Sequence, residues 1–202
     1  DSSKLKICLQ QAEAGVDVIY HKLKCYKVNS ANEISFSGGL GFRDVSDLPY
    51  EKLLQYGPSL TTSAIIVRKS CLLSINGLDE NMDLVGGEDY DLWLHLALKG
   101  AKFKFIDSVQ GEYTIHSGNN SAQLLRQIKN VETLLHHHVF KLQTFNKNSQ
   151  QLWDQFRPML NVQKIKQLLS DGDFFQACLI ILNSLFSHPF QFISYIYNKI
   201  IR

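Results

Sequence analysis

An α/β domain followed by an all-helical extension is the fold class that the sequence predicts. In residues 1–120, helical periods alternate with short runs of β-branched and aromatic residues, and glycines close the helices. From residue 121 onward helical periods dominate and the strand pattern ends. We therefore place a domain boundary near residue 120 and treat residues 121–202 as a helical extension.

The first part reads as helices and strands in alternation. A segment rich in Ser, Gly and Asn, residues 29–47, is predicted to be a loop or a loose hairpin. Asn76-Gly77 is a strong turn signal. Helices are predicted over 3–14, 49–56, 68–75 and 90–99, and strands over 16–28, 63–67, 103–106 and 112–116.

The helical extension contains the most apolar stretch of the chain, from Phe174 to Phe186. Gln176 and Asn183 interrupt it, and it falls short of the ~20 residues that span a bilayer. Breaks between its helices are predicted near residues 146–149, 158, 171–172 and 188–189.

Charge is distributed unevenly between the two parts. The net charge of +2 is too small to indicate a nucleic-acid partner. Residues 120–202 carry nine Lys and Arg against four Asp and Glu, whereas the rest carries twelve against fifteen. A basic extension suits contact with anionic lipid or an acidic partner. A solvated helical surface with a modest basic bias explains the same numbers.

The four cysteines do not indicate a metal site or a disulfide framework. Cys8, Cys25, Cys71 and Cys178 lie far apart, and no pair has a metal-ligand spacing. We expect buried free thiols in a reducing compartment. His136, His137 and His138 are consecutive within a helical run, where side chains project ~100° apart, so they cannot all ligate one ion. We interpret them as structural.

Two carboxylates, Glu88 and Asp89, are predicted at the start of a helix, directly after Gly86 and Gly87. Acidic side chains suit a helix N-terminus, which carries partial positive charge. The glycines allow a tight turn and close approach of a ligand. Acidic capping of an amphipathic helix is the alternative explanation of the same pattern.

The surroundings of these carboxylates carry a family resemblance. An Asn-Gly-Leu-Asp-Glu turn at 76–80 precedes Gly-Gly-Glu-Asp-Tyr-Asp-Leu-Trp at 86–93, and Gly100 closes the helix. A strand over 102–106 and a Tyr-x-x-His at 113–116 follow, leading into small polar residues. This ordered set resembles the second half of family 2 glycosyltransferases, which have the GT-A fold. With Lys4-Leu5 and the Val-Asp-Val-Ile-Tyr run at 16–20, the resemblance covers about residues 1–121.

The resemblance implies a partial GT-A (Rossmann-like) mixed sheet that lacks the nucleotide-binding half. In that family a βαβ half precedes this region and ends in a metal-binding Asp-x-Asp motif. By the usual spacing, this motif would lie a few residues before Asp1. We therefore expect that the chain is a fragment, and that most ligands of the expected Mg²⁺ or Mn²⁺ lie upstream of Asp1.

The resemblance also implies roles for individual residues. Asp89 matches the general base that activates an acceptor hydroxyl. One base without a protein nucleophile gives inversion, unlike the paired carboxylates of glycosidases. His116 matches a histidine that contacts metal or diphosphate, although a surface position explains it equally well. We expect Trp93 in the core and Asp91 toward solvent. The expected substrate-binding residues are Gly87, Glu88, Tyr90, Thr62 and Ser63, the last two also explicable as turn residues.

The function expected on these grounds is inverting transfer of a sugar from a nucleotide-sugar donor to a glycan or lipid-linked acceptor. We expect such an enzyme in the cytoplasm, peripheral on the inner face of the cell membrane through its helical extension, with no nucleic-acid partner. The alternative is a non-catalytic carbohydrate-binding or assembly scaffold with a GT-A-derived fold. A metal-dependent hydrolase is a weaker alternative, because the sequence lacks a paired His/Asp ligand cluster.

Overall fold

The computed structural model describes residues 3–12, 15–29, 31–41, 43–79, 86–115, 124–142 and 149–201 of the 202-residue chain. Two compact units make up the chain, residues 1–122 and residues 123–202. The first unit combines helices with a four-stranded mixed sheet, and the second is helical in its described part. The predicted α/β class is therefore confirmed. Each unit is described by itself.

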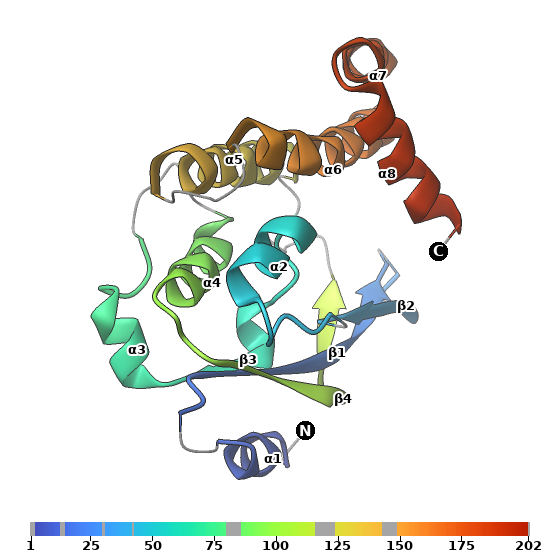
Figure 1. The fold of residues 1–202 in the computed structure, drawn as a ribbon. Coiled ribbons are helices and arrows are strands. Elements are labelled where there is room, and N and C mark those ends of the chain that lie inside the picture. The colour runs from blue at the N-terminus through green and yellow to red at the C-terminus, as the bar shows by residue number, and fades with distance from the viewer. Residues whose placement is uncertain are drawn as a thin grey trace. The chain divides into compact units, whose positions relative to one another are not determined.

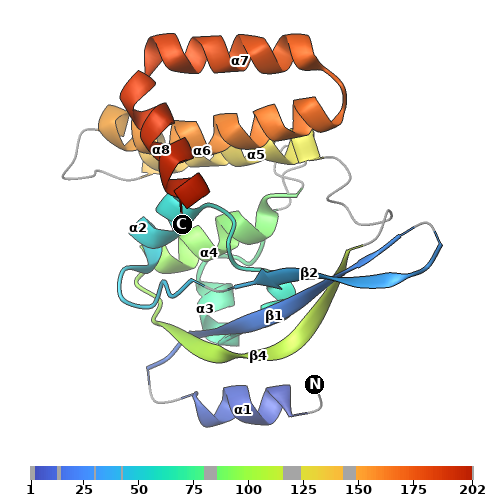
Figure 2. The ribbon, with the colours of Figure 1, turned by 90° about the vertical axis from the view of Figure 1, so that its right-hand side faces the viewer.

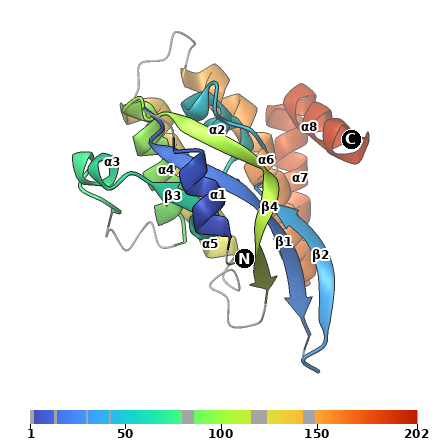
Figure 3. The same ribbon diagram turned by 90° about the horizontal axis from the view of Figure 1, so that it is seen from below.

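The sheet of the first unit is built around β1 (Val18–Val28). β1 pairs antiparallel with β2 (Ile34–Leu40) and with β3 (Ile65–Val67), and parallel with β4 (Phe103–Ile115). In Figure 3, β1 runs between β2 and β4. The first four residues of β1 are all buried, which is the pattern of a strand covered on both faces.

Helices cover both faces of this sheet (Figure 1). On one face lies α1 (Lys4–Gln10), whose buried Cys8 packs against Ile19 of β1 and Ile106 of β4. The opposite face carries α2 (Pro49–Tyr56) and α4 (Glu88–Leu98), which contact each other. The short helix α3 (Lys69–Ser74) follows β3. These two layers fix the start of α4, which carries the candidate carboxylates.

Several elements of the first unit differ in part from the predictions, and α1 and β3 are shorter than predicted. The segment 29–47, predicted as a loop or a loose hairpin, contains a regular strand, β2, which forms a hairpin with β1. The strands predicted over 103–106 and 112–116 are parts of one long strand, β4. Its pairing with β1 shifts register after His21, and such irregularities bend a strand without ending it. The intervening polar residues hid this continuity, because the alternation of apolar residues is lost at an irregularity.

The second unit contains α5 (Leu124–His137), η4 (His138–Leu142, one stretch of π-helix), α6 (Ser149–Ser170), α7 (Phe174–Ser187) and α8 (Pro189–Ile201). Figure 2 shows α6 and α7 side by side, joined by a tight turn. The breaks predicted at 171–172 and 188–189 are confirmed. The break predicted at 158 is wrong, because Pro158 lies inside α6.

Burial explains why α6 continues through its proline. Proline removes one backbone hydrogen bond and crowds the preceding turn, which disfavours an isolated helix. Pro158 itself is buried, and Phe156, Met159 and Leu160 beside it are buried as well. Packing of these side chains outweighs the local cost, so the helix does not end there.

The three consecutive histidines have different surroundings. The His136 ring lies 4.6 Å from that of Phe140 and 5.4 Å from that of Trp153, between ring centroids. His137 is exposed and His138 is buried. This divergence follows from helix geometry, which points neighbouring side chains in different directions.

Candidate functional site around Asp89

The start of α4 is shaped by two glycines. Gly86 adopts φ +84°, a conformation that disfavours residues with a side chain, and Gly87 is the N-cap residue. Three acidic residues, Glu88, Asp89 and Asp91, occupy the first turn. The carboxylate of Glu88 turns back and accepts a hydrogen bond from the Gly86 N–H. Glu88 thus closes the turn, and the adjacent Asp89 is left for another role.

Asp89 is half-buried and contacts the segment before β3. Its Oδ2 accepts a hydrogen bond from the Thr62 hydroxyl at 3.2 Å. Residues 62 and 89 are far apart in sequence, and the fold joins them through η1 (Thr62–Ala64), a single 3₁₀ turn. Among the described residues, no Lys, Arg or His forms an ion pair with Asp89. The carboxylate therefore lacks a neutralising partner in this part of the chain.

Burial raises the pKa of the Asp89 carboxyl above its ordinary value of 3.8, because a carboxylate loses solvation there. The negative charge of Glu88 adds to this rise. Hydrogen bonds from the Tyr90 N–H and the Thr62 hydroxyl oppose it. A carboxylate with a raised pKa is a stronger base, which is what proton abstraction from an alcohol requires.

The loop before β3 is fixed from the other side by α1. Lys4 Nζ donates to the Ser63 carbonyl oxygen at 2.6 Å, and the Ala64 N–H donates to the Thr61 carbonyl at 2.9 Å. Thr62 and Ser63 keep exposed side chains. The structure thus brings Thr62 to Asp89, and it ties Ser63 to α1 through its backbone.

Three buried polar atoms near these two segments have no hydrogen-bond partner within the described residues. They are Ser59 Oγ, Thr61 Oγ1 and Trp93 Nε1. Ser59 and Thr61 precede η1, and Trp93 lies one helical turn after Asp89. Buried polar atoms are nearly always paired in proteins, so each unpaired one calls for an explanation, such as a bound water, an ion or a catalytic role. Here they belong to the two segments that meet at Asp89.

Tyr90 does not fit the substrate-binding role predicted for it. Its side chain is completely buried, and its hydroxyl donates to the Leu53 carbonyl of α2 at 2.9 Å. It anchors α4 to α2, which removes it from the candidate binding set. Trp93 is 2% exposed, so its predicted place in the core is confirmed.

Asp91 also differs from its prediction, because it is buried instead of exposed. It was expected to face solvent, but it is 6% exposed and its Oδ2 lies 3.1 Å from Nδ1 of His95. Hydrogen bonding to Asp91 raises the pKa of His95 above 6.5. The signal available in the sequence was the i, i+4 spacing of an acid and a histidine on one helix face. Carboxylate and imidazole are both groups that ligate divalent metals.

The other predicted site residues have these positions. Gly87 is buried as the N-cap residue of α4, and Glu88 is half-buried. His116, the tentative metal ligand, lies outside the described residues. Contact of Gly87, Glu88, Thr62 and Ser63 with a substrate stays a prediction.

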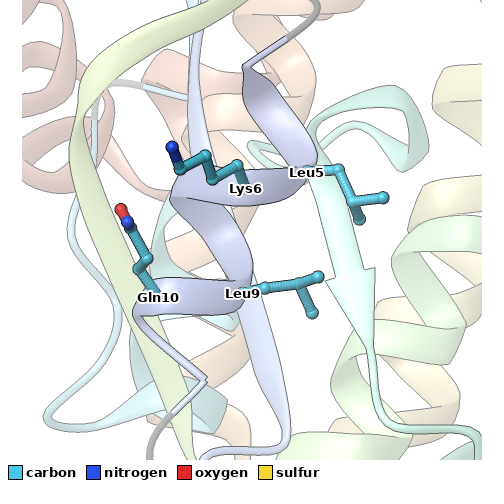
Figure 4. Close-up of a pocket in the computed structure, with 4 residues that line it drawn as sticks. All are labelled: Leu5, Lys6, Leu9 and Gln10. Atoms are coloured by element: carbon cyan, nitrogen blue, oxygen red, sulfur yellow. The ribbon is translucent and has the colours of Figure 1, made fainter.

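A shallow pocket lies elsewhere in the first unit, on α1. Its lining residues are Leu5, Lys6, Leu9 and Gln10. In Figure 4 the two leucines project to one side of the helix and Lys6 and Gln10 to the other. None of the predicted site residues lines it, so it supplies no chemistry to Asp89.

Comparison with protein-family models, with curated proteins and with solved structures gave no match to this chain.

Proposed function

We propose that this chain carries the catalytic base of an inverting glycosyltransferase, and that the base is Asp89. The observation that supports the proposal most directly is the environment of this carboxylate. The carboxylate of Asp89 is half-buried, its pKa is raised, and its Oδ2 accepts a hydrogen bond from Thr62. Among the described residues it forms no ion pair. The order of motifs around it, from the turn at 76–80 to Gly100, is the second support.

In the proposed reaction Asp89 removes a proton from an acceptor hydroxyl as the oxygen attacks the anomeric carbon. The new C–O bond forms on the face opposite the departing nucleoside diphosphate, which takes the electron pair of the broken bond. The proton remains on Asp89 and passes to solvent afterward. No protein nucleophile is involved, so the anomeric configuration inverts.

Thr62 and Glu88 have supporting parts in this proposal. The Thr62 hydroxyl donates to Oδ2 of Asp89 and thereby orients the carboxylate. Glu88 raises the basicity of its neighbour through charge repulsion. A hydrogen-bond donor and a neighbouring acid both act on the pKa of the carboxylate, which is how the basicity of a general base is adjusted.

A divalent cation, Mg²⁺ or Mn²⁺, would neutralise the charge on the departing diphosphate. Within the described part of residues 3–115, no three Asp, Glu, His or Cys side chains come together as a cage for it. His116 is the tentative ligand that the resemblance implies in this sequence, and it lies outside the described residues.

A donor and acceptor screen tests the proposed function. The purified full-length protein is offered a panel of nucleoside-diphosphate sugars and glycan or lipid-linked acceptors, with Mn²⁺ or with a chelator. We expect metal-dependent transfer whose product has, by NMR, the anomeric configuration opposite to that of the donor. Retention of configuration would contradict the proposal. Glycan binding without turnover of any donor would instead favour the non-catalytic scaffold.

A further inference from the structure

The second unit has its own apolar core at the junction of α6, α7 and α8. Ile165, Ala177 and Phe192, one from each helix, are buried together there. Partly buried apolar residues surround them, among them Ile180 and Ile181 of α7 and Ile196 of α8. This core uses only one side of α7 and one side of α8.

The opposite side of α7 is also apolar, and it is exposed. Phe175, Leu179, Leu182 and Phe186 follow the 4-3-4 spacing that places residues on one face of a helix. Phe175 is 72% exposed and Phe186 85% exposed. Gln176 and Asn183 lie on a narrow strip beside this face. An apolar helix face of this length without cover is unusual for a soluble surface.

The exposed apolar face continues on α8. Phe190, Ile193 and Tyr197 repeat the helical spacing, and Phe190 is 85% exposed. Phe186 and Phe190 flank the bend between the two helices, at His188. We define the apolar face of α7 and α8 as Phe175, Leu179, Leu182, Phe186, Phe190, Ile193 and Tyr197.

The charges of this unit favour one occupant of the face. From Phe174 to Asn198 the sequence contains no Asp, Glu, Lys or Arg, yet residues 120–202 carry nine basic against four acidic residues. A second copy of a basic unit would bring like charges together. An anionic lipid surface would accept the uncharged apolar face and would attract the net positive charge of residues 120–202.

Length and composition agree with a lipid partner. Among the described helices, no single one is long and apolar enough to cross a bilayer. Taken together, α7 and α8 are long and apolar enough to cross a bilayer, but the chain bends by 116° between them. A bent, apolar helix pair suits shallow insertion at the level of the lipid headgroups.

From these observations we infer that the apolar face of α7 and α8 docks on the surface of an anionic lipid bilayer, with Phe186 and Phe190 at the bend as the deepest contacts. This inference does not depend on the role of Asp89. It concerns the second unit alone and holds whether or not the first unit transfers sugars.

Vesicle flotation of the whole chain tests the inference. The vesicles consist of phosphatidylcholine with about a third phosphatidylglycerol, or of phosphatidylcholine alone, and we expect stronger binding to the former. The double variant Phe186→Gln/Phe190→Gln should lower partitioning into anionic vesicles about tenfold or more, because two large apolar side chains lose their lipid contact.

A matched control uses two exposed apolar residues of the first unit. Ile34 and Phe36 of β2 are 70% and 67% exposed, and Ile34→Gln/Phe36→Gln should leave partitioning unchanged. Flotation of the wild-type chain with neither vesicle type, equal flotation with both, or equal loss in both double variants would overturn the inference. So would a wild-type dimer in sedimentation velocity that the Phe186→Gln/Phe190→Gln variant dissociates.

A fluorescent label provides a second readout that does not depend on variants in the face. Cys178 of α7 is exposed, between Phe175 and Leu182. In a Cys71→Ser background, an environment-sensitive dye on Cys178 should shift to the blue when anionic vesicles are added. An unchanged spectrum while the protein floats would place the lipid contact elsewhere and contradict the inference.

Discussion

At the scale of single residues, the proposed chemistry rests on how two neighbouring carboxylates divide their roles. Glu88 satisfies the backbone of the turn before α4, and Asp89 keeps a half-buried carboxylate beside Thr62. The resemblance implied different roles for the two, with Asp89 as the base and Glu88 in substrate binding, but it did not imply the hydrogen bond of Glu88 to the turn. It did not predict the partner, because Thr62 reaches Asp89 only through the folding of β3 against β1.

The pH dependence of turnover follows from the burial of Asp89, to which the charge of Glu88 adds. Asp89 acts as a base only when deprotonated, so activity should fall as pH decreases through its raised pKa. Glu88→Gln removes the smaller, repulsive contribution to this pKa, so the acid limb of the pH–rate profile should move to lower pH. Measurement of kcat/KM against pH in both proteins checks this. An acid limb that does not move would show that Glu88 has no electrostatic influence on the base.

At the scale of elements, the glycines and the Asn-Gly turn predicted the ends of helices correctly. Gly57, Gly100 and the Asn76-Gly77 turn follow the helices predicted before them, and α2 has the predicted bounds 49–56. The misses have tertiary causes. β4 appeared as two strands because its irregularity interrupts the alternation, and α6 continues through Pro158 because the proline is buried in packing. Single-sequence patterns do not contain this information.

Tertiary contact also decides how costly a glycine substitution is. Gly41 follows β2 with φ +70°, and a Cβ there would lie 2.7 Å from the His21 carbonyl oxygen of β1. Gly77 has a similar φ of +78° but nothing within 4 Å of such a Cβ. Gly77→Ala should therefore lose about 1 kcal/mol, from backbone strain alone. Gly41→Ala should lose clearly more, about 2–4 kcal/mol, because backbone must also move.

Urea unfolding followed by circular dichroism compares the two glycine variants. Both variants lose free energy of unfolding because alanine is strained at a positive φ. The difference between the two losses therefore measures the clash of residue 41 with β1. Equal losses in the two variants would indicate that β1 and the segment after β2 do not approach as closely as described.

At the scale of the whole molecule, the chain divides into two compact units, and each has buried apolar residues of its own. Leu23 lies in the core of the sheet, at 2% exposure, and Ile165 lies in the core of α6, α7 and α8. Truncation of a buried Leu or Ile to Ala costs about 2–5 kcal/mol. We expect calorimetry to show two transitions, with Leu23→Ala lowering one midpoint and Ile165→Ala the other. One transition that both variants lower equally would contradict separate cores.

The features that we propose to be functional are divided between the two units. The carboxylates, Thr62 and the unpaired polar atoms belong to the first unit, and the apolar face of α7 and α8 belongs to the second. The sequence predicted the change of pattern near residue 120 and the apolar character of the last helices. It did not predict that one side of α7 and α8 is left exposed, because periodicity does not tell which of two apolar sides is covered.

The most direct test of the central claim is the turnover of Asp89→Asn in the purified full-length protein with its best donor and acceptor. Asparagine keeps the shape of the side chain and cannot take a proton, so kcat should fall by about 100-fold or more. Asp171→Asn, an exposed position in the turn between α6 and α7, serves as the matched control and should keep its turnover. Near-normal turnover of Asp89→Asn, with thermal unfolding showing that it is folded, would contradict Asp89 as the catalytic base.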